Sequence, residues 1–457
     1  MLRRVWPLQP YDRAIAMFFA LVLLTLGIAA VMSAPLSYDG AFYLFRVLDS
    51  QRFSAEHLRL INIPLQLPVL IAMRLTADMS VLRVAFSAAY ASIPVFALAV
   101  SWFVCKSRRP SLFIWPAMSI CIAALPGQFA FQSEAMMAVT LLWPALLVVL
   151  IGASPLVWPW VAITSIAATC SHPYAGLVLA LIVLVAIASA IVRAESRKRS
   201  LGLALGLSVL LLTRLLAPLD AYESQAMGLH TIVMSLNDSV IGWPLVAIAF
   251  TMVAALSCLL FGESRARLYL IAPLVLAGVA LVAWVIRPAN WKNCLDYRYW
   301  VAPFSLPLMT GAVVEELWLR KSTEPRLQEI RRYAVSSIGA IFFLVLSIQS
   351  FQWALVSQRL ANEMMNSDHG CVSRRTMTSV RDTALDFWSI GVYAVELQGR
   401  KPKTLVLAHK FACRMFALNG DAILVDNGMM TYIRRRGEGW FDFEDARSRI
   451  AKPGKIR

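Results

Sequence analysis

The chain has 457 residues, of which 59% are hydrophobic and 15% are charged, and its formal net charge is +16. Soluble domains are on average about 45–50% apolar and about 25% charged, so this composition argues against a soluble fold. The basic residues flank apolar segments and form no basic, aromatic patch. The charge therefore indicates membrane topology, and no nucleic-acid partner is expected.

Eleven apolar runs in the first 356 residues have about the length of a transmembrane helix. They lie at residues 14–33, 82–104, 111–126, 136–152, 156–170, 176–192, 201–218, 240–260, 268–286, 299–319 and 333–356. The first run is too long for the core of a signal peptide, so we expect it to remain as a helix. The sequence thus predicts an all-α polytopic membrane body over residues 1–356 and a polar tail over 357–457.

One basic cluster precedes the first run, and the others follow the second, sixth, eighth and tenth runs. They are Arg3/Arg4, Lys106/Arg108/Arg109, Arg193/Arg197/Lys198/Arg199, Arg265/Arg267 and Arg320/Lys321/Arg326/Arg331/Arg332. If every run crosses, all clusters fall on one side, which the positive-inside rule assigns to the cytoplasm. The first outer loop (34–81) and the tail are then expected on the periplasmic or extracellular face. The N-terminus is expected in the cytoplasm, and the membrane is expected to be a bacterial inner membrane.

The first outer loop contains two apolar segments. Residues 43–48 place apolar side chains at helical spacing beside charged ones, which predicts an amphipathic helix next to the membrane. Residues 61–73 form a shorter apolar run interrupted by Pro64 and Pro68. We expect this run to lie in the membrane interface.

The tail combines a polar, helix-like stretch with β-branched runs at 403–408 and 422–432, which predicts a small α/β domain. Cys371 and Cys413 are its only cysteines. In an oxidising compartment they are the pair expected to form a disulfide. The seven cysteines show no CxxC or Cys/His spacing, so no zinc site is predicted.

The strongest candidate for chemistry is Asp39, which lies between Tyr38 and Gly40 just beyond the first predicted helix. A carboxylate at the membrane surface among aromatic residues can accept a proton from a sugar or lipid hydroxyl. An Asp before Gly also commonly caps a helix, so a catalytic role and a structural role remain open. Glu134 is a second acid on the same face, and it too is explained by stabilisation of a helix N-terminus.

Other polar residues fall on the outer face. His172 in the turn Ser171–Gly176 can bond a phosphate or sugar oxygen. Arg298 and Lys292 suit a phosphate, with Asp296 between them, although an interfacial anchor among Tyr and Trp explains them equally. Arg214, near the outer end of its run, can instead extend its charge outward to the interface.

These features resemble the GT-C superfamily of polytopic glycosyltransferases, which use polyprenyl-phosphate-linked sugars. The segment Tyr38-Asp39-Gly40 is similar to the family's first loop, whose aspartate is the catalytic base. Glu134 is similar to its second acidic position, where many members have Asp and some bind metal. The turn at His172 and the Asp296–Tyr299 segment are similar to its His-Pro turn and late Arg-Tyr motif. The resemblance covers 1–356 in topology, about thirty residues in motif, and none of the tail.

The resemblance implies inverting transfer of a sugar from a polyprenyl-phosphate donor to a lipid, glycan or protein acceptor, with Asp39 as general base. It implies no certain cofactor, and Mg²⁺ or Mn²⁺ is left open. Two other readings stay open. A transporter or flippase would show paired halves and charges at mid-membrane, which the sequence lacks. A non-catalytic envelope assembly protein would use the tail to bind a partner.

The predicted topology can be tested by cysteine labelling. Because the five basic clusters agree with eleven crossings, a cysteine at Lys455 is expected to react with an impermeant maleimide in intact cells. A cysteine at Lys198 serves as the control and is expected to react only after the membrane is permeabilised. Labelling of position 455 that requires permeabilisation would overturn the topology.

Overall fold

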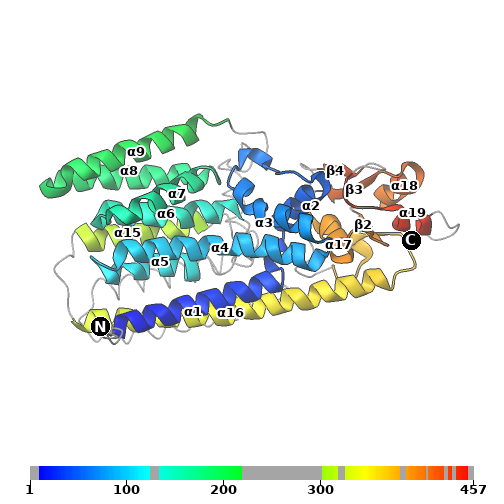
Figure 1. The fold of residues 1–457 in the computed structure, drawn as a ribbon, viewed down its shortest axis with the longest axis horizontal. Coiled ribbons are helices and arrows are strands. Elements are labelled where there is room, and N and C mark those ends of the chain that lie inside the picture. Colours follow the sequence, from blue (N-terminus) through cyan, green and yellow to red (C-terminus); the bar gives the residue numbers. More distant parts are fainter. Residues whose placement is uncertain are drawn as a thin grey trace.

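A computed structural model describes residues 10–123, 133–218, 301–317, 325–380, 387–407, 410–426, 431–434 and 439–450. Within these ranges the fold is mostly helical, and its strands lie in the tail (Figure 1). The predicted runs at 240–260 and 268–286 lie outside the described residues.

Six helices among the described residues are long and apolar enough to cross a membrane, which indicates a membrane protein. They are α1 (Pro10–Val31), α4 (Met79–Cys105), α6 (Glu134–Ile151), α8 (Tyr174–Val192), α9 (Arg197–Leu216) and α16 (Pro325–Met365). Three other predicted runs form shorter helices. These are η3, α5 and η4 (Pro110–Phe113, Ile114–Met118 and Ser119–Ala123), η6 and α7 (Pro155–Val157 and Trp158–Thr169), and α15 (Val301–Leu317).

Helix α6 lies at the centre of the membrane body. Its 18-residue span is 100% buried, and it packs against α4, α7, α8 and α15. By contrast, the span of α9 is only 22% buried by the described residues, and apolar side chains such as Leu205 and Leu212 are exposed. Large exposed apolar surface of this kind suits contact with lipid.

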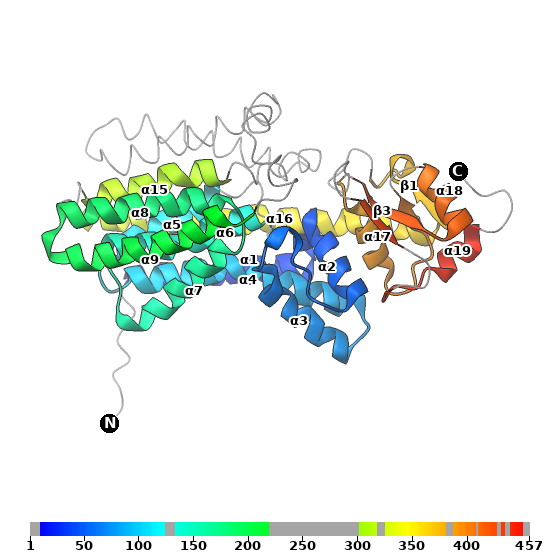
Figure 2. The ribbon, with the colours of Figure 1, turned by 90° about the horizontal axis from the view of Figure 1, so that it is seen from above.

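Helix α16 runs beside α1 and continues into the tail (Figures 1 and 2). Close packing occurs at Gly339, where an added Cβ would meet Phe18 of α1 at 3.1 Å. At about 1.5 Å per residue, the 41 residues of α16 span roughly 60 Å, about twice the hydrocarbon thickness of a bilayer. The expected boundary at residue 356 therefore lies inside a continuous helix.

The segment between α1 and α4 forms four helical elements. These are η1 (Ala34–Leu36), α2 (Asp39–Ser50), η2 (Glu56–Leu58) and α3 (Asn62–Leu75). Helix α2 is the predicted amphipathic helix, but the structure buries most of it, from Gly40 to Asp49, instead of leaving it on a membrane surface. Helix α3 is the predicted proline-interrupted run and includes Pro68. It packs against α4 and α2.

The tail is a small α/β unit, as the sequence predicts. Its elements are β1 (Cys371–Ser373), η10 (Arg374–Thr376), α17 (Ile390–Gln398), β2 (Leu405–Leu407), α18 (Lys410–Asn419), β3 (Ala422–Asp426), β4 (Thr431–Arg434) and α19 (Glu444–Ile450). Strands β1 and β2 are parallel, with Cys371 opposite Leu405. Strands β3 and β4 are antiparallel, with an irregularity between Ile423 and Val425.

The tail packs directly on α2. The ring of Phe45 stacks on Phe441 at 4.9 Å and meets Tyr432 edge-on at 5.2 Å. Next to them, the buried carboxylate of Asp49 accepts hydrogen bonds from the Tyr432 hydroxyl at 2.6 Å and from the backbone N–H of Trp440 at 3.1 Å. Helix α2 and the tail therefore share one interior.

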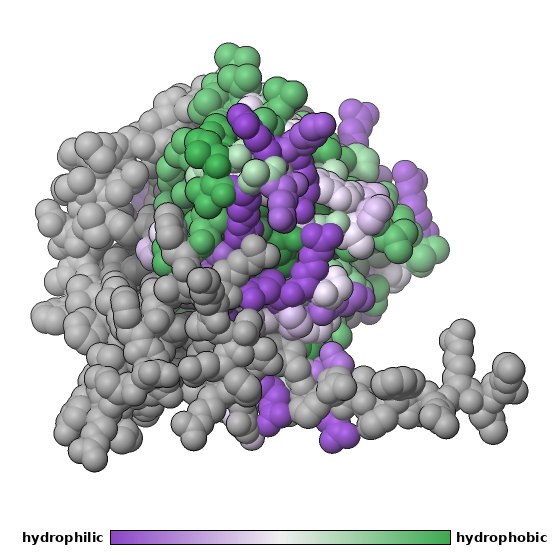
Figure 3. Space-filling model, turned by 90° about the vertical axis from the view of Figure 1, so that its left-hand side faces the viewer, coloured by the Kyte–Doolittle hydropathy of each residue, from purple (hydrophilic) through white to green (hydrophobic). Residues whose placement is uncertain are grey.

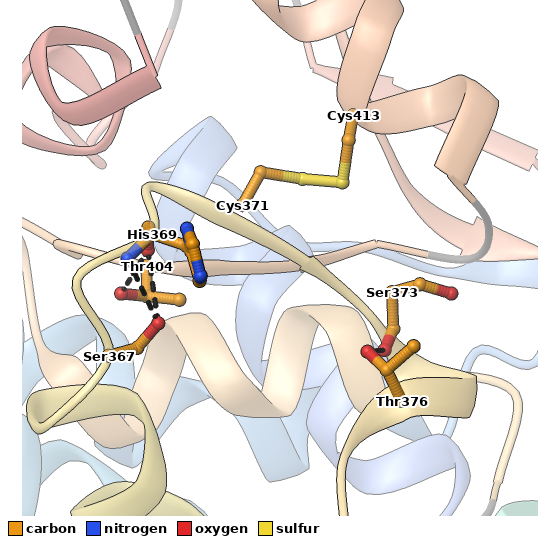
Figure 4. Close-up of a disulfide and its surroundings, with 7 residues drawn as sticks. All are labelled: Ser367, His369, Cys371, Ser373, Thr376, Thr404 and Cys413. Carbon is orange, nitrogen blue, oxygen red and sulfur yellow. Dashed lines mark hydrogen bonds between the residues drawn. A yellow bond between two sulfur atoms is a disulfide. The ribbon is translucent and has the colours of Figure 1, made fainter. Parts of the chain in front are cut away.

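The predicted disulfide between Cys371 and Cys413 is present, and it joins β1 to α18 (Figure 4). The chain leading into β1 is held separately. The Thr404 hydroxyl donates to the carbonyl of His369 at 2.9 Å, and the His369 N–H donates to the Ser367 hydroxyl at 3.1 Å. The tail is thus stabilised both covalently and by polar contacts at this corner.

Removal of the disulfide should destabilise the tail. It closes a loop of 42 residues, so Cys413→Ser is expected to lower the free energy of unfolding by about 2–4 kcal/mol. The measurement is pulse proteolysis of the tail in urea on the full-length protein, with Cys170→Ser as the control. Mass mapping that finds Cys371 and Cys413 both as free thiols without reductant would contradict the bond.

Candidate functional site

Four of the sequence-predicted residues, or their flanking turns, lie at one end of the bundle, beside the tail; we call this the tail end. Asp39 begins α2, which packs on the tail, and Glu134 begins α6. His172 precedes α8, and the neighbouring Cys170 carbonyl accepts a hydrogen bond from the Ile61 N–H at 3.2 Å. The Arg214 side chain lies within 4 Å of the position of a Cβ on Gly176.

Asp39 is half-buried and held by the tail. Its Oδ1 accepts a hydrogen bond from the indole N–H of Trp388 at 3.0 Å, and the neighbouring Ser389 hydroxyl donates to the Tyr38 carbonyl. Tyr38 is the N-cap of α2 and has a φ of 59°, which is strained for a residue with a side chain. Asp39 is therefore the first residue of the helix and not its cap, although its charge still interacts favourably with the helix dipole.

Aromatic rings surround Asp39. The Trp388 ring lies 5.1 Å from Phe42 and 6.3 Å from Tyr38, and Phe387 lies 6.5 Å from Tyr38. Two of these rings come from α2 and its cap, and two come from the tail. A partly exposed carboxylate in an aromatic wall can bind a hydroxyl while apolar faces contact the rest of a ligand.

Glu134 has a different environment. Its side chain is 2% exposed and forms an ion pair with Arg59 at 2.9 Å, while its other oxygen accepts a hydrogen bond from the Asn62 amide at 3.0 Å. The side-chain oxygen Oδ1 of Asn62 in turn accepts a hydrogen bond from the Tyr90 hydroxyl at 2.9 Å. Both carboxylate oxygens of Glu134 are thus engaged, which indicates that Glu134 connects α6 to α3 and α4.

Tyr43 lies between the two acids. Burial raises the pKa of its hydroxyl well above the ordinary value, and the nearby charges of Glu134 and Asp39 raise it further, while Arg59 opposes them. Tyr43 is therefore protonated at neutral pH. The hydroxyl also accepts a hydrogen bond from Arg59 at 3.4 Å. The charges of Asp39 and Glu134 thus both act on Tyr43.

His172 has a structural role in its turn. Its side chain is buried, and Nδ1 accepts a hydrogen bond from the backbone N–H of Tyr174 at 3.2 Å, at the start of α8. The predicted residues Lys292, Asp296 and Arg298 lie outside the described residues.

Glu134 is not arranged as a metal ligand in this structure. Among the described residues, no group of three His, Cys, Asp or Glu side chains could hold one. Glu134 already has two nitrogen donors on its oxygens, and a metal would have to displace both.

The sequence did not identify Arg59, Asn62 and Trp388. Arg59 lies just before the apolar run at 61–73, and Asn62 is the second residue of that run. A charged residue and an amide at the start of an apolar run could have pointed to a buried polar contact. Trp388 is 349 positions from Asp39, and no local pattern connects the two.

The ion pair of Glu134 predicts a stability effect. Glu134→Gln leaves the buried charge of Arg59 without its partner and is expected to cost about 3–5 kcal/mol. Adding Arg59→Gln should recover part of the loss, with a coupling energy of roughly 1–3 kcal/mol. The measurement is unfolding in detergent for both single variants and the double variant. If the two single effects on the free energy of unfolding were strictly additive, the ion pair would contribute nothing to stability. Asp78→Asn, at an exposed helix cap, is the control.

Comparison with known proteins leaves the chain without an established family: no family model matches it, and no match appears among curated proteins or among solved structures.

Proposed function

We propose that this protein transfers a sugar from a polyprenyl-phosphate donor to a hydroxyl of a lipid, glycan or protein acceptor at the tail end of the bundle. The observation that carries the proposal is the contrast between the two acids. Glu134 is buried in an ion pair, whereas Asp39 is partly exposed at the start of α2, in an aromatic wall built by the loop and the tail.

In the proposed reaction, Asp39 accepts the proton of the acceptor hydroxyl as that oxygen attacks the anomeric carbon of the sugar. The bond from the anomeric carbon to the phosphate oxygen breaks, and polyprenyl phosphate leaves with the bonding electrons. A single displacement of this kind inverts the configuration at the anomeric carbon. The hydrogen bond from Trp388 fixes the orientation of the carboxylate, which a general base requires.

The leaving phosphate needs a cation. Arg214 is the described candidate, because it lies beside the turn that contains His172 at the same end of the bundle. Arg298 and Lys292 complete the proposed set. A groove of about 750 Å³ lined by Arg52, Arg74 and apolar residues of α3 lies at the far end of α2. At about 1.5 Å per residue along α2 it is roughly 18 Å from Asp39, too far to hold the leaving group.

The proposal includes the full topology. Eleven crossings would place the tail and Asp39 on the outer face of the membrane, where lipid-linked sugars can be used without a nucleotide. The described residues agree in one respect: the clusters at Arg108, Arg193 and Arg331 all lie at the end opposite the tail.

Substitution of Asp39 tests the reaction. Asp39→Asn keeps the size and the hydrogen-bonding capacity of the side chain but removes the base, so turnover should fall by a factor on the order of 10²–10⁴. The assay follows release of polyprenyl phosphate from a panel of polyprenyl-phosphate hexoses and pentoses, with membranes of the source cell as acceptor. Mass spectrometry of the purified protein should also detect copurified polyprenyl phosphate.

The matched control is Asp78→Asn, which removes an exposed carboxylate near the start of α4 and should leave turnover unchanged. Trp388→Phe keeps the ring but loses the hydrogen bond to Asp39. It should lower kcat more than it raises KM. Wild-type turnover in Asp39→Asn would reject Asp39 as the base.

A further inference from the structure

A second polar site lies at the end of the bundle opposite the tail, which we call the basic end. A cavity of about 970 Å³ opens there among the ends of the membrane helices. Its lining contains four arginines, Arg108, Arg109, Arg193 and Arg199. Figure 3 views the molecule from this end and shows hydrophilic side chains gathered between hydrophobic ones. The proposed sugar transfer uses none of these residues.

Two of the arginines share one acid. Glu316 of α15 is 1% exposed, and its two oxygens lie 3.1 Å from Arg109 Nε and 3.1 Å from Arg193 Nη2. The cavity lining contains one other acid, Glu195, which is exposed. Four arginines against two glutamates leave a formal charge of +2 in the lining.

The positive charge concentrates at Arg108 and Arg199. A Cβ on Gly152 would lie within 3 Å of a terminal nitrogen of each, so both guanidinium groups converge on one backbone position. Among the described residues neither has a carboxylate within ion-pair distance, and Arg199 Nε is buried without a hydrogen-bond partner. Two like charges held together favour an anion between them.

A structural role accounts for only part of this arrangement. Arg108 donates to the carbonyl of Ile151 at 2.7 Å and Arg193 donates to that of Leu150 at 2.6 Å, so both satisfy the C-terminus of α6. A guanidinium carries five N–H donors, and the bond of Arg108 to the Ile151 carbonyl uses one of them. Capping also gives no reason for Arg199 to be directed at the same position.

The surroundings indicate an amphiphilic ligand. Leu150, Ile151 and Val192 share the lining with the arginines, and they stand at the last residues of α6 and α8, where a membrane helix meets the lipid headgroups. Basic pockets between transmembrane helices at this depth bind anionic headgroups. A soluble anion would gain nothing from the apolar residues.

We propose that this cavity binds the phosphate of an anionic membrane lipid, with Arg108 and Arg199 as the two principal ligands. The phosphate oxygens accept hydrogen bonds from both guanidinium groups, and the acyl chains lie against the apolar ends of α6 and α8. The lipid thereby links the loop that follows α4 to the first turn of α9.

The test is native mass spectrometry of the full-length protein in detergent with phosphatidylglycerol, phosphatidylcholine or inorganic phosphate added. The wild type should retain phosphatidylglycerol at least ten-fold more than phosphatidylcholine. R108Q/R199Q should lose that preference, and R108K/R199K should keep much of it. The matched control is K106Q/R197Q, which removes two exposed charges of the same clusters.

Equal loss in R108Q/R199Q and K106Q/R197Q would overturn the proposal, because general surface charge would then explain retention. Competition by millimolar inorganic phosphate as effective as that of the lipid would overturn the lipid as the ligand. Folding is checked separately by size-exclusion profile and by sugar transfer, which R108Q/R199Q should retain. A failure of sugar transfer in the wild type does not affect this test.

Discussion

The structure depends on the packing of the tail against α2. Phe45 is enclosed by rings of the tail, and the buried Asp49 beside it accepts hydrogen bonds from the tail, so the tail stabilises both side chains in that position. Glu396 of α17 is fully buried nearby, and burial raises the pKa of its carboxyl, with Arg83 opposing that effect. A neutral carboxyl is what an interior of this kind favours. Because α2 begins at Asp39, the same packing sets the position of the candidate base.

Buried ion pairs neutralise charges at both ends of the bundle. At the tail end, Glu134 buries a negative charge and Arg59 compensates it, so that the acid serves the structure. At the basic end, Glu315 and Glu316 are adjacent on α15 and compensate arginines from three different segments, including Arg331 at 2.6 Å. Each end thus contains one neutralised set of charges that holds helices together, and one group beside it that is more accessible to a ligand.

Periodicity and hydropathy predicted the elements well, because burial in a membrane demands long apolar runs and strands need β-branched ones. They placed α2, α3, β2 and β3, but not β1. The Cys371–Cys413 pair was predicted because these are the only cysteines of the tail. Periodicity and hydropathy did not place the tail against α2, because an amphipathic pattern shows that a face is apolar but not what covers it. The contact between Trp388 and Asp39 could not be predicted for the same reason. Three of the basic clusters are described and lie at one end of the bundle, while the count of eleven crossings stays a prediction.

Contacts between the start and the end of the chain also constrain its biosynthesis. Asp39 and Trp388 are separated by 349 positions, which at about 5–20 residues per second takes a ribosome roughly 20–70 s to make. During that interval the membrane helices can insert one after another. The aromatic face of α2 lacks its contacts with the tail until the tail has been made. A truncated chain would keep its helices in the same order in the membrane. Its Asp39 carboxylate would lack the hydrogen bond from Trp388 that orients it. The hydrogen bond that orients Asp39 can therefore form only after the segment that contains Trp388 has been synthesised.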